Sequence, residues 1–129
     1  MQRNPAQNYL QNRIETATPE QLTLMLLEGA GRYSVLAQHC LEAKDYSNAN
    51  AHLQRCQLIL EELMSSLNFD AGPVAKNLFK IYEYLYFRLV QANIRKDPSH
   101  IPEVTQYLGE LRDSWRQAMP SMKKGARHG

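Results

Sequence analysis

Apolar residues recur at helical spacing in four blocks of the chain, and helix-breaking residues separate the blocks. This pattern is clearest in the block after Lys44-Asp45, where the spacing alternates strictly between four and three residues. Its apolar positions are Ala49, Leu53, Cys56, Leu60, Leu63 and Leu67. Such a repeat places every member on one face of an α-helix. Since no segment shows the alternation typical of a strand, the sequence predicts an all-α fold.

The other three blocks repeat the pattern. The first begins at residues 18–21, Thr-Pro-Glu-Gln, which offer an N-cap hydroxyl, a proline at the first helical position and a glutamine for a capping box. Its predicted core stripe is Leu22, Met25, Leu26, Gly29, Tyr33, Leu36, Cys40 and Leu41. The third block carries Ala75, Leu78, Tyr82, Leu85, Leu89 and Ala92. The fourth carries Ile101, Val104, Leu108, Leu111 and Trp115.

Short connections join the four predicted helices, at residues 44–45, 68–73 and 96–98. Because short connections make sequential helices antiparallel neighbours, the expected architecture is an up-down-up-down four-helix bundle over residues 18–119. Residues 1–17 form an N-terminal segment ahead of it. Pro120 is expected to end the last helix and to open a flexible basic tail, 120–129.

Composition and charge exclude several classes of protein. The net charge is only +2, and basic residues cluster only in the tail, at Lys123, Lys124 and Arg127, so a nucleic-acid partner is not expected. The longest uncharged apolar stretch, 22–27, is too short to cross a bilayer. Without a signal-type apolar run at the start, the cytoplasm is the expected location, with no membrane insertion.

No catalytic, cofactor or metal site is expected. The chain lacks a glycine-rich phosphate loop and a nucleophile elbow, and His52 with Cys56 supplies only two metal ligands of the four in a structural site. Cys40 and Cys56 fall on apolar stripes and are interpreted as small buried hydrophobes rather than a disulfide. A signalling bundle that phosphorylates His39 or His52 stays open as an alternative, because such domains need only an exposed histidine.

The third helix carries more apolar residues than a bundle core needs, which is about three in seven. Between residues 78 and 90 only Lys80, Glu83 and Arg88 are polar. The surplus forms two lines beside the core stripe: Phe79, Tyr86 and Val90, and Ile81, Tyr84 and Phe87. We interpret these as an exposed aromatic groove that receives a partner's helix. A helix packed on several sides, or the face of a structural homodimer, stays open as an alternative.

The first helix shows a milder surplus. Leu24 and Leu27 lie off its predicted core stripe. Gly29 and Gly31 sit in mid-helix, where each glycine costs about 1 kcal/mol relative to alanine, so a packing reason is expected. The absence of a side chain lets another backbone approach, from a neighbouring helix or from a bound segment.

Residues 7–30 resemble the opening of the FliS chaperones, in which a tyrosine-led polar segment runs into Thr-Ala-Ser/Thr-Pro and then Leu-x-x-Met-Leu-x-x-Gly-Ala. Further similarities follow in family order, over residues 7–117 in all. They include residues 59–63, 66–67, 77–78, 82–84, 88–89, 92–93, 111–112 and 115. The sequence departs from the family pattern at Leu27, usually tyrosine, and at Gly31, usually bulky.

The resemblance implies a cytoplasmic bundle that binds the C-terminal region of flagellin, prevents its premature polymerisation and helps to deliver it to a component of the flagellar export gate. It also implies that the N-terminal segment folds over part of the binding surface. A weak homodimer is left open. The candidate partner-binding residues are Tyr9, Leu10, Ile14, Leu24, Leu27, Phe79, Ile81, Tyr82, Tyr84, Tyr86, Phe87 and Val90.

Overall fold

The computed structural model describes residues 5–128, and side chains for residues 8–120. The helices are α1 (Pro5–Thr16), α2 (Pro19–Glu42), α3 (Tyr46–Ser65), α4 (Pro73–Arg95) and α5 (Ile101–His128). Two short 3₁₀ turns, η1 (Phe69–Ala71) and η2 (Pro98–His100), connect α3 to α4 and α4 to α5. No strand occurs within residues 5–128, and the prediction of an all-α fold is confirmed.

Helices α2, α3 and α4 begin where the sequence indicated. At the start of α2, the Gln21 backbone N–H donates to the Thr18 hydroxyl at 3.1 Å, and the Gln21 side chain accepts from the Thr18 N–H at 2.9 Å. This reciprocal pair is the predicted capping box. Asp45 caps α3. Gly72, with φ of 120°, adopts a backbone conformation that favours glycine immediately before α4.

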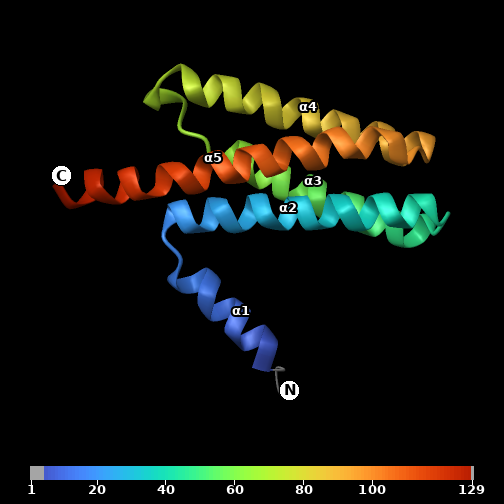
Figure 1. Cartoon of the computed structure of the whole chain (residues 1–129), viewed down its shortest axis with the longest axis horizontal. Coiled ribbons are helices and arrows are strands. Elements are labelled where there is room, and N and C mark those ends of the chain that lie inside the picture. The colour runs from blue at the N-terminus through green and yellow to red at the C-terminus, as the bar shows by residue number, and fades with distance from the viewer. Residues whose placement is uncertain (1–4, 129) are drawn as a thin grey trace.

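Helices α2 to α5 lie lengthwise against one another, each running back along the one before, and α1 leans away from them (Figure 1). We call α2–α5 the helical body. Helix α2 packs against both α3 and α5, and α4 packs against the same two helices. The core therefore lies along the axis that these four helices share.

The predicted core faces of three helices are confirmed. In α3 the buried residues are Ala49, Leu53, Cys56, Leu60 and Leu63. In α4 they are Ala75, Tyr82, Leu85, Leu89 and Ala92. In α5 they are Ile101, Val104 and Leu108, with Leu111 and Trp115 packed against the core at its edge.

The predicted core face of the first helix is confirmed only in part: Gly29 and Leu41 are buried, and Leu26, Tyr33 and Cys40 pack against the edge of the core. The residues of α2 that are buried are Leu27, Gly29, Ala30, Ser34, Ala37 and Leu41. Leu36, which was placed in the core, is 44% exposed. Large side chains alone do not mark the core face of this helix. Small residues face the neighbouring helices instead, and they let those helices approach closely: the Ser34 hydroxyl lies 2.8 Å from the Thr105 hydroxyl of α5.

The prediction that Pro120 ends the last helix is also wrong. Helix α5 contains Pro120 and continues to His128. A proline inside a helix removes the hydrogen bond to the carbonyl four residues earlier, here Arg116, and its ring crowds that carbonyl, which disfavours the helix without excluding it. The side chains of Lys123, Lys124 and Arg127, on which the prediction of a basic tail depends, lie outside the described residues.

Both cysteines are free, as the sequence indicated. Cys56 is fully buried and Cys40 is half-buried. Across residues 5–128, no helix combines the length and the apolar character that crossing a membrane requires.

Candidate partner-binding surfaces

The surplus aromatic residues of α4 do not form one continuous exposed face. Ile81 and Tyr86 pack against the edge of the core, and Phe79 meets Phe69 of η1 edge-on, with 5.9 Å between ring centroids. Val90 is half-buried. Tyr84 and Phe87 are the members that reach solvent, with 46% and 56% of their surface exposed.

The structure corrects the prediction that Tyr82 contacts a partner. It is only 4% exposed and belongs to the core, because it lies on the same helical face as Leu85 and Leu89. Burial also raises the pKa of its hydroxyl. A side chain in this position cannot contact a partner unless the helical body opens, so Tyr82 is removed from the candidate surface.

Carboxylates on neighbouring helices accept hydrogen bonds from two of the α4 tyrosines. The Tyr84 hydroxyl donates to Glu103 of α5, which also pairs with Arg88 at 3.5 Å. The Tyr86 hydroxyl donates to Glu61 of α3 at 3.0 Å. Each carboxylate stabilises the protonated phenol and raises its pKa. These bonds fix the tyrosine rings against the helical body.

The N-terminal residues lie elsewhere on the molecule. Tyr9, Leu10 and Ile14 are all exposed on α1. Leu10 and Ile14 line a pocket of about 230 Å³ whose other walls come from α2 and α3, including Tyr33 and Ile59. The structure therefore does not bring the α1 residues together with the aromatic residues of α4.

The two predicted partner-binding residues of α2, Leu24 and Leu27, differ in their exposure. Leu24 is half-buried and lines a pocket of about 350 Å³ together with Met25 and Met119. Leu27 is only 2% exposed and belongs to the core, and its remaining exposed surface lines the groove between α2 and α5 described next. Its burial differs from the prediction, which placed it off the core stripe of α2.

A larger groove runs between α2 and α5, with a volume of about 690 Å³. Leu27 and Leu108, which are almost fully buried, line it together with the exposed apolar residues Val35 and Leu36. Its full lining is Leu27, Glu28, Gly31, Arg32, Val35, Leu36, Thr105, Leu108, Gly109, Arg112 and Arg116. We call this the α2/α5 groove.

One glycine on each helix keeps the groove open. A Cβ atom added to Gly31 of α2 would meet nothing within 4 Å. A Cβ atom on Gly109 of α5 would meet only the far end of the Arg112 side chain, at 3.7 Å. Backbone is thus exposed on both walls, where a bound segment can approach more closely than over any side chain.

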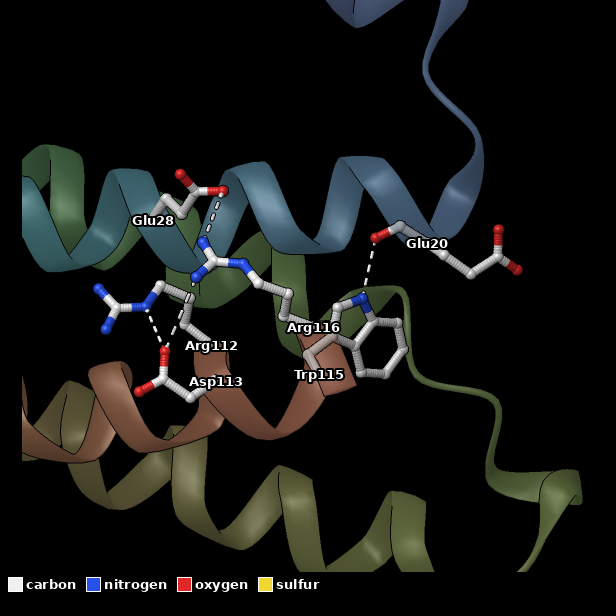
Figure 2. A network of polar contacts seen from close by, with 6 residues as sticks. All are labelled: Glu20, Glu28, Arg112, Asp113, Trp115 and Arg116. Atoms are coloured by element: carbon white, nitrogen blue, oxygen red, sulfur yellow. Dashed lines mark hydrogen bonds and ion pairs between the residues drawn. The ribbon is translucent and has the colours of Figure 1, made fainter. Parts of the chain in front are cut away.

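Basic side chains surround the groove. Arg112 and Arg116 extend from α5 toward α2 (Figure 2). Both reach one oxygen of Asp113, Arg112 at 2.9 Å and Arg116 at 4.0 Å, and Arg116 also lies 4.0 Å from Glu28 of α2. The hydrogen bond from Arg112 lowers the pKa of the Asp113 carboxyl. Beyond them, the Trp115 indole N–H donates to the Glu20 carbonyl at 2.9 Å and ties α5 to the start of α2.

The sequence pattern alone does not reveal this groove. Gly31 is expected to allow a close approach, but nothing in the pattern connects it with Gly109 or with the arginines on either helix. The sequence features that indicate the groove are two mid-helix glycines with arginines after them. Gly31 is followed by Arg32 in α2, and Gly109 is followed by Arg112 and Arg116 in α5. Only the packing of α2 against α5 shows that these residues share one surface.

Residues with catalytic or metal-binding chemistry are dispersed. Within the described residues, no group of three or more histidine, cysteine or acidic side chains could hold a metal ion. The Cys56 thiol donates to the Ala30 carbonyl at 3.3 Å, and burial raises its pKa to about 12. His52 stacks on Tyr33 with 6.0 Å between ring centroids. His39 is exposed on α2 and lines none of the three pockets described above.

Comparison with known proteins gives a consistent result. A family model described as "Flagellar protein FliS" matches residues 2–122. The chain is 40% identical over 126 residues to the flagellar secretion chaperone FliS of Bacillus subtilis, covering 98% of this chain and 93% of that protein. It is 33% identical over 117 residues to the FliS of Salmonella typhimurium, covering 89% and 87% of the two chains.

A solved structure shares the fold. It is described as the crystal structure of a flagellar chaperone from bacteria, and it superposes with a TM-score of 0.75 at 20% sequence identity. The superposition covers 91% of this chain and 99% of that one.

Proposed function

Because the chain belongs to the FliS family of flagellar secretion chaperones, we propose that it binds the C-terminal helical region of flagellin in the cytoplasm, prevents premature polymerisation and assists delivery to the flagellar export apparatus. The family is one of chaperones and not of enzymes. The comparisons support neither a phosphotransfer bundle nor a purely structural homodimer.

The observation that carries this proposal is the α2/α5 groove, whose lining combines nearly buried leucines with the exposed side chains of Val35 and Leu36. An amphipathic helix of a partner buries its apolar face in such a groove. Further apolar side chains are exposed around the helical body, among them Tyr84 and Phe87. A partner that is unfolded before binding can wrap over several such surfaces, because it folds as it binds.

Two parts of the chain have different roles in this proposed function. Residues 18–119 act as an antiparallel four-helix bundle that carries the cargo. Residues 1–17, which include α1, act as a cap that protects apolar surface when cargo is absent. Leu10 and Ile14 support this role, because they already line a pocket with α2 and α3 while most of α1 leans away (Figure 1). The chaperone with its cargo is then recognised by a component of the export gate.

Calorimetric titration of the full chain with a C-terminal fragment of the flagellin from the same organism tests the proposal. We expect saturable binding at micromolar concentrations, and we expect the chaperone to slow flagellin polymerisation measured by light scattering. Absence of both effects would contradict the proposed cargo.

The cap has its own test. Tyr9→Ala should leave the melting temperature unchanged, because Tyr9 is exposed, and should change the affinity for the flagellin fragment. An unchanged affinity would remove Tyr9 from the proposed cap. Light scattering of the free chain over a range of concentrations measures any weak homodimer.

A further inference from the structure

We infer that the hydroxyl groups of Ser34 and Thr105 set the width of the α2/α5 groove and thereby act as positioning residues for cargo binding. This inference rests on the proposed chaperone function and adds a buried pair that acts on the binding surface from within the helical body. It predicts that the pair can be removed with little loss of stability but with a clear loss of affinity.

The two hydroxyls form a short chain of hydrogen bonds between α5 and α2. Ser34 is fully buried, and its hydroxyl donates to the Gly31 carbonyl at 2.6 Å. The Thr105 hydroxyl lies 2.8 Å from the Ser34 oxygen and 3.4 Å from the Ile101 carbonyl. Each hydroxyl has a single proton, and that of Ser34 is already donated, so the Thr105 hydroxyl donates to Ser34. The chain therefore links α5 to the backbone of Gly31, which borders the groove.

The short reach of these side chains makes the pair a spacer. In both residues the hydroxyl oxygen is bonded directly to Cβ, so the 2.8 Å contact forms only where the two backbones lie close together. Helix axes in contact lie about 8–10 Å apart, and small side chains at the contact select the short end of this range. Threonine is also β-branched and stiff about its first side-chain torsion. The pair therefore fixes the separation of α2 and α5 at one point.

A second hydrogen bond fixes the same two helices at the other end of the groove. Among the side chains that the structure describes, two hydrogen bonds join α2 to α5: the Ser34–Thr105 pair, and the bond of 2.9 Å from the Trp115 indole N–H to the Glu20 carbonyl (Figure 2). On each helix, the glycine that keeps the groove open lies between the two bonded residues. The open part of the groove is thus held between two fixed points.

A fixed width matters for binding because a segment in the groove contacts both walls at once. Walls that already have the right separation do not have to be ordered when the segment binds, and this lowers the cost of association. Thr105 itself lines the groove, whereas the buried Ser34 cannot touch a bound segment. An effect of Ser34 on affinity must therefore be transmitted through the helices.

Removal of both hydroxyls is the first experiment. Ser34→Ala/Thr105→Val keeps nearly the same shape and leaves neither hydroxyl without its partner, so the melting temperature should stay close to that of the wild type. We expect the affinity for the flagellin C-terminal fragment, measured by calorimetric titration of the full chain, to fall roughly three- to tenfold as the walls lose their fixed separation. Ser34→Ala alone, which leaves Thr105 the Ile101 carbonyl as an acceptor, should weaken binding in the same direction and serves if the double variant folds poorly.

A matched control removes a similar pair elsewhere. The Asn93 side chain of α4 donates to the Asn50 side chain of α3 at 2.8 Å, and neither residue lines the α2/α5 groove. Asn50→Leu/Asn93→Leu deletes this bond between helices at nearly constant volume and should bind the fragment as the wild type does. A conservative variant, Thr105→Ser, keeps the hydroxyl and should bind more tightly than Thr105→Val.

Trp115 reports the separation of the helices directly, because it is the single tryptophan of the chain and bonds to α2. In the free Ser34→Ala/Thr105→Val variant its fluorescence emission should shift to longer wavelength as the indole gains contact with water. The emission of the asparagine control should not change. This readout does not require cargo.

The outcomes separate this inference from the proposed function. If the wild-type chain binds the fragment and the double variant binds equally well, the inference is overturned and the chaperone function stands. An equal loss of affinity in the asparagine control, or equal binding by Thr105→Ser and Thr105→Val, also overturns it, because the effect would then not belong to these hydroxyls. If the wild-type chain does not bind at all, the proposed function fails, and an unchanged Trp115 emission in the double variant shows separately that the pair does not set the width.

Discussion

The two sides of α2 are built from similar small residues and have opposite properties. On the side that faces α3, Ala30 is fully buried and its carbonyl accepts a hydrogen bond from the Cys56 thiol. On the side that faces α5, the next residue, Gly31, borders a groove in which an added Cβ would touch nothing. The contact with α3 is closed by packing at Ala30, whereas the α5 side is closed at Ser34 and left open at Gly31.

The difference teaches that small residues serve two purposes in this helix. At Ala30, Ser34 and Ala37 they allow neighbouring helices to approach, and the contact is filled. At Gly31 the space is not filled by the helical body, and the cost of a mid-helix glycine, about 1 kcal/mol relative to alanine, is not recovered by packing within the chain. A binding role for this position supplies the missing reason.

The largest expected contrast is in the reactivity of the closed side. Burial raises the pKa of the Cys56 thiol from 9.0 to about 12, so its thiolate population below about pH 9 falls about a thousandfold. We expect iodoacetamide at pH 8 to label Cys40, which is half-buried, and to spare Cys56 for as long as the chain stays folded. Mass spectrometry of tryptic peptides over time measures both rates. Rapid labelling of Cys56 would mean that the α2/α3 side opens readily and that the comparison is wrong.

The same shift has a consequence for stability. The folded protein keeps the Cys56 thiol protonated while the unfolded chain ionises it above its ordinary pKa of 9.0. The stabilising contribution is therefore complete below pH 9 and declines as the pH rises from 9 toward 12, because the unfolded state then binds fewer protons. Cys56→Ala should lose this part of the decline in melting temperature, and an identical decline in the variant would contradict the assignment.

The rotation of α2 can be tested by removing one leucine from each side of the helix. Leu27→Ala deletes a core side chain that is 2% exposed and should lower the free energy of unfolding by about 2–5 kcal/mol. Leu36→Ala removes a side chain that is 44% exposed at the edge of the groove and should change it by about 0.5 kcal/mol or less. Urea denaturation of both variants gives the two values. Equal losses would return Leu36 to the core, where the sequence pattern had placed it.

This rotation marks the limit of what the sequence pattern predicts. The core faces of α3, α4 and α5 were predicted correctly because large apolar residues such as Leu60, Leu85 and Leu108 define them. In α2 the core face is built largely from alanine, glycine and serine, which carry little hydrophobic signal, so larger residues outside it dominated the pattern. The predicted end at Pro120 failed because the continuation of a helix past a proline depends on the residues around it rather than on the proline alone.

The candidate surface was harder to predict than the fold. The sequence shows that α4 has surplus aromatic residues, but the orientation of their side chains depends on hydrogen-bond partners from other helices. Glu61 is the partner of Tyr86, and Glu103 is the partner of Tyr84. The α2/α5 groove depends on Gly31 and Gly109, which are 78 residues apart in the printed sequence (109 minus 31). Neither pairing follows from the spacing within one helix.

Adding one side chain at consecutive positions sharpens the comparison. Ala30→Leu forces extra atoms into a filled contact with α3 and should lower the free energy of unfolding by about 1–3 kcal/mol. Gly31→Leu adds the same side chain to open space and should not lower it. Thermal unfolding followed by circular dichroism compares the two. A loss of stability in Gly31→Leu equal to that in Ala30→Leu would show that both sides of α2 are closed.

The smallest expected effect is also the one that isolates the glycine. Gly31→Ala introduces a single methyl group that meets nothing within 4 Å, so neither strain nor new packing accompanies it. The free energy of unfolding should rise by about 0.5–1 kcal/mol, because alanine favours the helix and reduces the freedom of the unfolded chain. Urea denaturation should show a higher midpoint with an unchanged slope. If stability does not rise, the groove at Gly31 is occupied or distorted in the free protein, and the open side of α2 is less open than the structure shows.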